Sequence, residues 1–226
     1  MKIIALIPAR AGSKGVPNKN LQEINGKSLV QMSIETAKKV SEIEEVFVSS
    51  DSEKILSLSA DCGASLIMRS AEASGDEARA EAVVEHFLNQ IKGRFQDELL
   101  LVYLQPTSPF NSPESIKECI KIYLAKSKPV VSVRKIADYP EKMLTLDQKG
   151  RLLPFHPDAK ATVNRQELPE RLIPTGAIYV FSEEDFNKSR NIPVSGALPC
   201  VVSGKESLDI DNELDLEIAR KLGEKK

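Results

Sequence analysis

Short apolar runs alternate along the chain with longer stretches in which apolar residues recur at helical spacing. The runs predict strands at 3–7, 46–48, 65–68, 99–104 and 130–133. The stretches between them predict helices around 29–37, 55–59 and 82–91, and another helix that begins after Ser112. This alternation indicates an α/β fold of three layers, in which helices cover both faces of a mostly parallel sheet.

The pattern changes after residue 135. Apolar residues at 143–146 and 152–153 flank a polar turn, which predicts a hairpin with exposed apolar side chains. Such a hairpin is either a plain insertion or an arm that packs on a second subunit, and the sequence favours neither. A strand at 177–181 and a final helix at 213–222 follow. We therefore divide the chain into an α/β domain, residues 1–135 and 173–226, and an inserted arm, residues 136–172.

Composition and charge exclude several classes of protein. The 31 basic and 33 acidic residues nearly cancel, which argues against a nucleic-acid-binding protein. Three cysteines and two histidines lie far apart, so we expect reduced thiols and neither a disulfide framework nor a zinc site. The apolar run at the N-terminus is short, and no stretch approaches the ~20 apolar residues of a membrane span. We expect a soluble, cytoplasmic protein without a membrane partner.

The loop at 8–20, which follows the first predicted strand, carries the strongest chemical signal. Gly12 and Gly15 allow the backbone to turn its N–H groups towards an anion. Three basic residues lie in the same loop: Arg10, Lys14 and Lys19. Since ligands of parallel sheets bind beyond the carboxyl ends of the strands, the loop is a candidate cradle for the phosphates of a nucleotide. The alternative is a solvated surface loop.

Two common phosphate motifs are excluded by spacing. Gly12 and Gly15 do not complete the glycine pattern of a dinucleotide fingerprint. The segment 26–28 has the ending of a P-loop, but Leu21 stands where the first glycine is required. Asn25 and Gly26 instead predict a tight turn.

Two further segments carry candidate chemistry. Gln105 begins the polar, proline-containing loop 105–109 after the fourth strand, which suits a polar ligand but also an ordinary turn. In an extended segment, Asp209 and Asp211 share one face while Ile210 faces the core. Such a pair of carboxylates suits Mg²⁺, whose other positions are filled by substrate phosphates. The alternative is that Asp211 or Asn212 merely caps the final helix.

These motifs resemble a known family. The run from Ile7 through Lys14 to Lys19-Asn20, the loop 105–109 and the segment 207–215 are similar to the signatures of the acylneuraminate cytidylyltransferases. The related octulosonate cytidylyltransferases typically have arginine in place of Lys14. The resemblance implies a nucleotide-diphospho-sugar transferase-like fold with a small dimerisation arm.

The resemblance implies roles for individual residues. Catalysis would rest on Lys19, Asp209 and Asp211, and the two aspartates would bind the metal. The nucleotide would be bound by Arg10, Gly12, Ser13, Lys14, Asn20, Arg69 and Asp76, and the acceptor sugar by Gln105, Arg165 and Tyr179. Arg165 would hold the sugar carboxylate, and the nearby Arg171 is an alternative. Asp51 follows the second predicted strand and is a further polar candidate at this edge of the sheet, but it is at least as well explained as the cap of the next helix.

The sequence departs from the family pattern at three positions, where it has Asn111, Ile173 and Thr175. These departures concern the sugar more than the reaction. The implied reaction joins CMP from CTP to the anomeric hydroxyl of a nine-carbon acidic sugar, with Mg²⁺, or Mn²⁺ as an alternative, in a homodimer. The alternatives are a nucleotidyltransferase for another acidic sugar, of the octulosonate type, and a non-catalytic sensor of nucleotide sugars.

Overall fold

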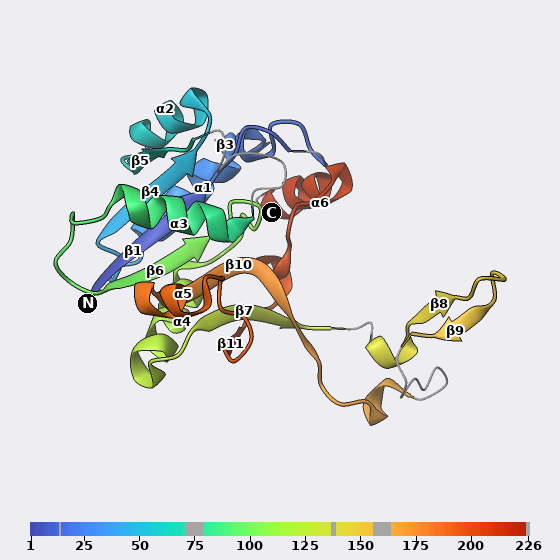
Figure 1. Ribbon diagram of the computed structural model, residues 1–226. Helices are drawn as coiled ribbons and strands as arrows, with labels where there is room; N and C mark the ends of the chain where they lie inside the picture. The colour runs from blue at the N-terminus through green and yellow to red at the C-terminus, as the bar shows by residue number, and fades with distance from the viewer. Residues whose placement is uncertain (14, 71–78, 137–138, 156–163, 225–226) are drawn as a thin grey trace.

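A computed structural model describes residues 1–13, 15–70, 79–136, 139–155 and 164–224. Its central sheet has seven strands in the order β11-β7-β10-β6-β1-β4-β5. Their bounds are β1 Lys2–Pro8, β4 Glu45–Ser50, β5 Ser65–Met68, β6 Leu99–Leu104, β7 Val130–Lys135, β10 Leu172–Ser182 and β11 Leu198–Val201. All neighbours pair in parallel except β10, which is antiparallel to both β6 and β7 (Figure 1). The predicted mostly parallel sheet is confirmed.

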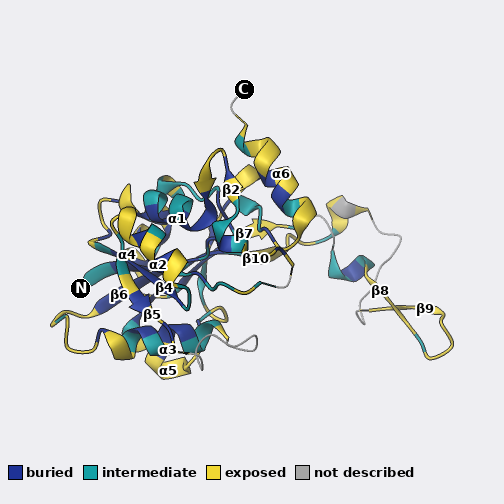
Figure 2. Cartoon of the chain, turned by 90° about the horizontal axis from the view of Figure 1, so that it is seen from above, coloured by how far each residue is buried: buried dark blue, intermediate teal, exposed yellow. Residues whose placement is uncertain are grey.

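Helices cover both faces of the sheet, which confirms the predicted layers (Figures 1 and 2). The helices are α1 Leu29–Lys38, α2 Glu53–Asp61, α3 Ala80–Gln90, α4 Pro113–Lys126, α5 Glu183–Ser189 and α6 Glu213–Gly223. One core cluster contains side chains of α1, α2 and α4, whereas the cluster on the other face contains side chains of α3 and α5. Burial of these apolar stripes supplies the main stabilisation of the layers.

The sequence located most of these elements. The strands at 65–68 and 99–104 have the predicted bounds. The side chain of Ser112 caps α4, and Pro113 is the first helical residue. The tight turn at Asn25 and Gly26 joins β2 Glu23–Ile24 to β3 Lys27–Ser28, and both residues have positive φ. Within the described ranges, every helix is too short or too polar to cross a membrane.

Three elements were missed or cut short. The helix α5 is short and begins with acidic residues, so it carries little apolar periodicity; a capping box between Ser182 and Asp185 starts it. The edge strand β11 is four residues long and contains Pro199. The strand predicted at 177–181 begins earlier, at Leu172, because its pairing with β7 continues across an irregularity between Pro174 and Tyr179.

The predicted hairpin is present as β8 Leu144–Leu146 and β9 Leu152–Pro154. It forms its own two-stranded sheet and lies apart from the central sheet in Figure 1. Every residue of both strands is exposed (Figure 2). At the base of this region, the half-exposed Arg171 forms a 2.5 Å ion pair with the buried Glu141. Arg171 therefore anchors the hairpin region.

Candidate active site

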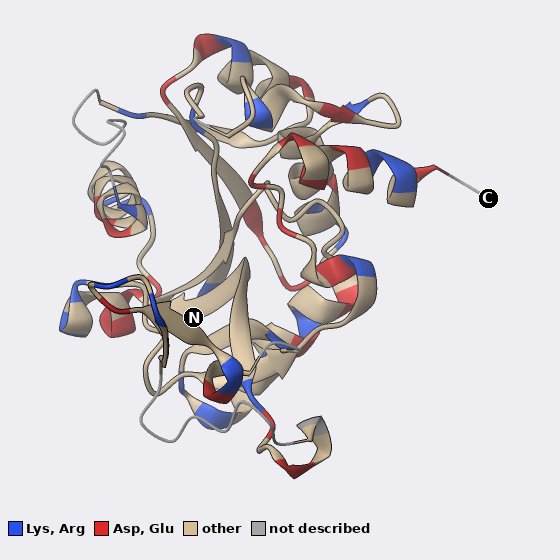
Figure 3. Ribbon diagram, turned by 90° about the vertical axis from the view of Figure 1, so that its right-hand side faces the viewer, with Lys and Arg blue, Asp and Glu red and all other residues tan. Residues whose placement is uncertain are grey.

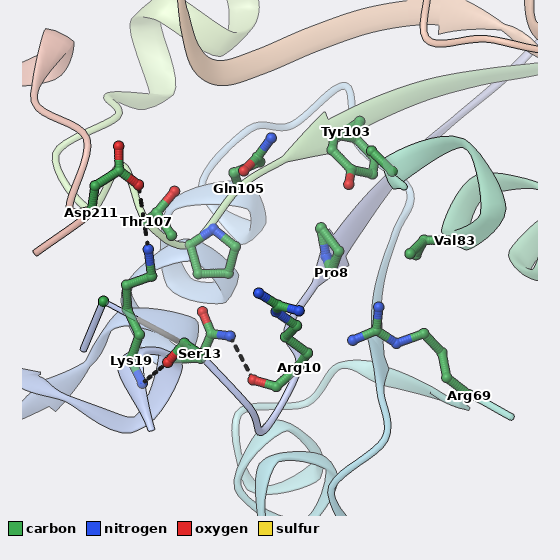
Figure 4. Close-up of a pocket in the computed structure, with 14 residues that line it drawn as sticks. Pro8, Arg10, Ser13, Lys19, Arg69, Val83, Tyr103, Gln105, Thr107 and Asp211 are labelled. Carbon is green, nitrogen blue, oxygen red and sulfur yellow. Dashed lines mark hydrogen bonds and ion pairs between the residues drawn. The ribbon is translucent and has the colours of Figure 1, made fainter. Parts of the chain in front are cut away.

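A cavity of about 390 Å³ opens at the carboxyl ends of β1 and β6, where the sequence predicted a ligand (Figure 4). Seven of the predicted site residues line it: Arg10, Ser13, Lys19, Asn20, Arg69, Gln105 and Asp211. They come from segments that lie far apart in the sequence. Sheet topology brings them together, because parallel strands end at the same edge.

Lys19 joins the loop after β1 to the aspartate segment near the C-terminus. Its Nζ donates a 2.6 Å hydrogen bond to the carbonyl oxygen of Ile210 and lies 3.6 Å from Oδ1 of Asp211. The Lys19 side chain is 15% exposed, whereas that of Asp211 is 76% exposed. Lys19 is thus held in place by a backbone oxygen, and its charge faces the cavity beside a solvated carboxylate.

Short polar contacts shape the loop itself. Ser13 Oγ accepts a 3.1 Å hydrogen bond from the backbone N–H of Lys19 and donates one to the carbonyl oxygen of Val16. Nδ2 of the buried Asn20 donates to the carbonyl oxygen of Arg10 at 2.9 Å. These bonds hold the loop in a curved path around the cavity, so that Ser13 and Asn20 organise the loop as well as line it.

Asp51 does not cap a helix, contrary to the interpretation drawn from the sequence. The cap of α2 is Ser52, whose side chain accepts from the N–H of Ile55. Asp51 Oδ1 instead accepts a 2.8 Å hydrogen bond from the backbone N–H of Ala11, forty residues earlier. The carboxylate therefore fastens the loop after β1 to the end of β4, a role that no local pattern signals.

Arg69 is the most unusual group in the cavity. The residue is 7% exposed, and the structure gives no hydrogen-bond partner to its Nε and Nη2 among the described residues. Burial lowers the pKa of the guanidinium and the nearby charge of Arg10 adds to this, whereas Asp51 opposes it. Figure 4 shows the side chains of Arg10 and Arg69 extending into the same cavity. A buried cation without a partner is costly unless an anionic or polar ligand completes it.

Asn20 offers a complementary orphan group. Its buried Oδ1 has no hydrogen-bond partner among the described residues, although its Nδ2 is satisfied. Asn20 and Arg69 both line the cavity, and each has buried polar atoms that lack a hydrogen-bond partner among the described residues. The phenol of Tyr103 also lines it, and burial raises the pKa of that phenol. Tyr103 was missed because it lies within the apolar run of β6, where the sequence signals only a core strand.

The segment at Asp209 and Asp211 has the predicted alternation. Ile210 is fully buried, while the two aspartates flank it on the side of the cavities. The N–H of Ile210 donates a 2.9 Å hydrogen bond to the carbonyl oxygen of Thr107, which ties the segment to the loop 105–109. Asn212, not Asp211, caps α6, in a capping box with Asp215. Asp211 is therefore left to face the cavity.

Two glycines allow this segment to lie close to its neighbours. A Cβ at Gly15 would lie 1.9 Å from the carbonyl oxygen of Asp211, so only glycine fits there. Gly176 has a φ of +78°, and a Cβ there would lie 3.3 Å from Oδ2 of Asp209. Gly12, in contrast, meets nothing within 4 Å and does not line the cavity. Of these two loop glycines, it is Gly15 that lies against the backbone of the aspartate segment.

A second cavity, of about 720 Å³, lies next to the first. Asp211 lines both cavities, and Asp209 lines the second. The remaining walls come from the ends of β7 and β10, from η4 Gly204–Ser207 and from α6. Two ligands that occupied the two cavities would meet at the aspartates.

The two aspartates fit a divalent cation by their chemistry. Asp209 is half-buried, and burial together with the charge of Asp211 raises the pKa of its carboxyl, although hydrogen bonds from Thr107 and Ser108 and the charge of Lys19 oppose this. A divalent cation would offset both the cost of burying the charged Asp209 carboxylate and the repulsion between the two carboxylates. The described residues contain no cluster of three or more metal-ligating side chains. A pair of carboxylates suits Mg²⁺, which takes most of its ligands from water and phosphate.

The remaining predicted residues have different placements. Lys14 and Asp76 lie outside the described residues. Arg165 begins η3 Arg165–Glu167, and its side chain is likewise not described. Tyr179 is on β10 in edge contact with Tyr103, 6.1 Å between ring centroids, and lines neither of the two cavities.

Comparison with solved structures defines the fold class. A CMP:2-keto-3-deoxy-manno-octonic acid synthetase complexed with CTP superposes with a TM-score of 0.72 over 98% of each chain, at 18% identity. A 4-diphosphocytidyl-2C-methyl-D-erythritol synthase from Anaerococcus prevotii gives 0.66 over 98% of this chain and 95% of that one, at 17% identity. The chain therefore has the α/β fold of nucleotidyltransferases.

Sequence comparison identifies the family. Residues 4–193 match the profile of the family described as cytidylyltransferase. A CMP-N,N'-diacetyllegionaminic acid synthase of Legionella pneumophila is 33% identical over 99% of this chain and 97% of its own length. An N-acylneuraminate cytidylyltransferase of Escherichia coli is 33% identical over the whole of this chain and 53% of its own. The chain belongs to the cytidylyltransferase family, and it spans about half the length of the Escherichia coli relative.

Proposed function

We propose that this chain transfers CMP from CTP to the anomeric hydroxyl of a nonulosonic acid, a nine-carbon acidic sugar. The named activities of the relatives from Escherichia coli and Legionella pneumophila support this reaction class. So does a relative from Campylobacter jejuni, 29% identical over 97% of this chain, which is named pseudaminic acid cytidylyltransferase. The observation that carries the proposal is the pair of adjacent cavities that share Asp211, one of which is lined by the buried Arg69, whose Nε and Nη2 have no hydrogen-bond partner within the described ranges.

In this proposal the first cavity holds CTP. The triphosphate lies against Arg10, Lys19 and the backbone of the loop after β1, because these groups bring positive charge to one wall. The nucleotide accepts hydrogen bonds from the unpaired N–H groups of Arg69 and donates one to the unpaired Oδ1 of Asn20. Lys14 and Asp76 are proposed to join this set on the basis of the family resemblance.

The second cavity holds the acceptor sugar, so that its anomeric hydroxyl meets the α-phosphorus beside Asp209 and Asp211. The hydroxyl oxygen forms a bond to that phosphorus, and the bond from the α-phosphorus to the oxygen that links it to the β-phosphorus breaks, so that pyrophosphate leaves. The hydroxyl proton passes to solvent. The chain contributes chiefly by positioning and by neutralising charge. Asp209 and Asp211 would hold Mg²⁺, which supplies Lewis-acid polarisation of the phosphate and hydroxyl oxygens when bound.

The reaction is tested by pyrophosphate release. We expect release with CTP and Mg²⁺ and one of three acids: N-acetylneuraminate, N,N'-diacetyllegionaminate or pseudaminate. An octulosonate and the nucleotides ATP, GTP and UTP are the controls. Absence of release with every pair, in protein that binds CTP, would contradict the proposal and favour a nucleotide-binding protein without this activity.

The metal assignment has its own test. Asp211→Ala should abolish turnover and leave the fold intact, because Asp211 is exposed and does not cap α6. Glu213→Ala is a matched control, since this exposed carboxylate lies two residues further along the same segment. Near-normal turnover of Asp211→Ala would contradict the assignment.

We further propose that the hairpin β8–β9 is the dimerisation arm. Its apolar side chains are strongly exposed for a protein surface, with Leu146 at 65%, Leu152 at 66% and the adjacent Phe155 at 64%. The family resemblance implies that such an arm reaches the active site of the other subunit, which would give Arg165 a route to the sugar. Sedimentation of the unaltered chain as a monomer would contradict this. The double variant of Leu146 and Leu152 to Asp should dissociate the dimer, whereas Leu124→Asp, on α4, should not.

A further inference from the structure

The strand β10 bulges where it passes β7 beside the second cavity. Between Pro174 and Tyr179, four residues of β10 lie opposite the single residue Ser132 of β7. On its other side, β10 stays paired with β6 from Ile178 onwards. A bulge bends a strand locally and re-aims its residues, and bulges are frequent beside active sites. The position of this one raises the question of what it holds in place.

Two buried hydroxyl groups close the bulge. Ser132 is fully buried, and Thr175 is 5% exposed. Thr175 Oγ1 donates a 3.2 Å hydrogen bond to the carbonyl oxygen of Ser132, so the 2.6 Å bond between the two hydroxyls is donated by Ser132. Ser132 Oγ also accepts a 2.9 Å bond from the N–H of Ile178. Thr175 Oγ1 accepts a 3.4 Å bond from the N–H of Ala177. The two side chains therefore replace the strand pairing that the bulge interrupts.

The neighbouring strand residues offer these hydroxyls few alternatives. Ser132 is the only polar residue within 130–133, and neither this segment nor 174–182 contains a charged side chain. In Figure 3 the charged residues gather on the helices and loops around the sheet, whereas the strands are mostly tan. A buried N–H or hydroxyl that loses its partner in such surroundings is costly. We therefore expect the bulge to shift when either hydroxyl is removed.

The bulge places Gly176 against the carboxylate of Asp209. Gly176 has a φ of +78°, and a Cβ there would lie 3.3 Å from Oδ2 of Asp209. The other carboxylate oxygen, Oδ1, accepts a 3.5 Å hydrogen bond from Ser108 Oγ. The N–H of Gln105 donates a 3.1 Å bond to the carbonyl oxygen of Ala177, which ties the bulge to the loop that carries Ser108. The Asp209 carboxylate thus lies between that loop and the backbone of the bulge.

We propose that Ser132 and Thr175 are positioning residues for the transfer reaction. By fixing the bulge, their hydroxyl pair holds Gly176 against Asp209 and keeps this carboxylate in place beside the cavities. The inference rests on the proposed function and adds to it two residues that act through the backbone. Thr175 lines the second cavity, but its hydroxyl bonds to Ser132 and to the strand backbone. Thr175 therefore affects the rate of transfer and not the choice among acids.

The test removes each hydroxyl with little change in shape. Thr175→Val keeps the branched side chain and loses the hydroxyl, Ser132→Ala removes the other hydroxyl, and Thr175→Ser keeps a hydroxyl at the same position. Ser59→Ala is the matched control: Ser59 is fully buried on α2, outside both cavities, and its Oγ donates a 2.7 Å bond to the carbonyl oxygen of Ile55. We measure kcat and KM for each acid that supports pyrophosphate release, the Kd for CTP by calorimetry, and thermal unfolding.

Hydrogen exchange followed by mass spectrometry gives a readout that depends on neither turnover nor metal. It is measured on peptides that contain residues 172–182 and 207–213, in protein without CTP or Mg²⁺. We expect both segments to exchange faster in Thr175→Val than in the unaltered protein, because the bulge and the Asp209 segment loosen together. Ser59→Ala should leave the exchange of both segments unchanged.

The expected effect on catalysis is a fall in kcat alone. We expect kcat to fall about tenfold in Thr175→Val and in Ser132→Ala, since the carboxylate moves by less than the ~1 Å that costs about a hundredfold. The KM for the acid and the Kd for CTP should stay within about twofold, and the relative kcat/KM values of different acids should not change. Thr175→Ser should recover most of the kcat. Ser59→Ala should lower the unfolding temperature as much as Thr175→Val does and retain its kcat.

Three results would overturn the inference. If Thr175→Val changes the KM for the acid or the preference among acids and keeps its kcat, Thr175 contacts the sugar directly. If Thr175→Ser is as impaired as Thr175→Val, the hydroxyl is not the group that matters. If Ser59→Ala loses as much kcat, the effect comes from general destabilisation. Absence of release by the unaltered protein is a different result: it removes the proposed function, and hydrogen exchange then decides alone whether the hydroxyl pair holds the Asp209 segment.

Discussion

Gly15 is the point at which the loop after β1 lies closest to the segment of Asp209 and Asp211. A Cβ atom at Gly15 would lie 1.9 Å from the carbonyl oxygen of Asp211, and real Cβ contacts essentially never fall below 3.0 Å. The substitution Gly15→Ala must therefore move the two backbones apart by about 1.1 Å, the difference between those distances. This movement would stretch the 2.6 Å hydrogen bond from Lys19 to Ile210 beyond its range.

The expected loss of activity follows from this displacement. A misplacement of about 1 Å between reacting groups costs about a hundredfold in rate. We therefore expect kcat/KM for pyrophosphate release to fall about a hundredfold in Gly15→Ala, and the free energy of unfolding to fall by about 1–3 kcal/mol from overpacking. The assay is run well below the unfolding temperature of every variant, so that loss of folded protein does not contribute.

Gly12→Ala is the matched control in the same loop. A Cβ at Gly12 meets nothing within 4 Å, and its backbone N–H is retained, so its kcat/KM should stay within about twofold of the original value. If Gly15→Ala keeps nearly full activity, the loop and the aspartate segment do not need their present separation. Equal losses in the two variants would mean that any side chain in this loop is harmful, and the argument from close approach would fail.

Three further predictions concern charged side chains at the site. Arg69→Met should weaken CTP binding by about a hundredfold while the unliganded protein becomes no less stable, because it removes a buried cation whose Nε and Nη2 have no hydrogen-bond partner among the described residues; thermal unfolding with and without CTP measures both. Asp51→Ala should raise the Kd for CTP by about tenfold in calorimetric titration, since the N–H of Ala11 loses its acceptor; an unchanged Kd would show that the loop holds its shape alone. Burial raises the pKa of the Asp209 carboxyl. Without metal, the free energy of unfolding of the unaltered protein should therefore fall relative to that of Asp209→Asn as the pH rises from the ordinary aspartate pKa through the raised value. The free energies of the two proteins should converge at lower pH, and unfolding experiments at several pH values measure this.

The local elements and much of the chemistry could be predicted from the amino-acid sequence. Strands were predicted at 65–68 and 99–104 with their actual bounds, because side-chain periodicity and strand length are local properties. The alternation around Ile210 followed in the same way, because successive side chains of an extended segment point to opposite sides. The basic, glycine-containing loop after β1 was likewise visible, since its charges lie within a few residues of one another.

How these groups come together depends on long-range packing, which local patterns do not record. The hydrogen bond from Lys19 to Ile210 spans 191 positions, and Asp51 reaches Ala11 rather than capping the helix beside it. Both contacts depend on strand order, above all on the placement of β1 between β4 and β6, which brings the ends of distant strands to one edge. A sequence pattern records which groups are present within a few residues, whereas the orphaned donors of Arg69 and the cavities that share Asp211 arise from long-range packing.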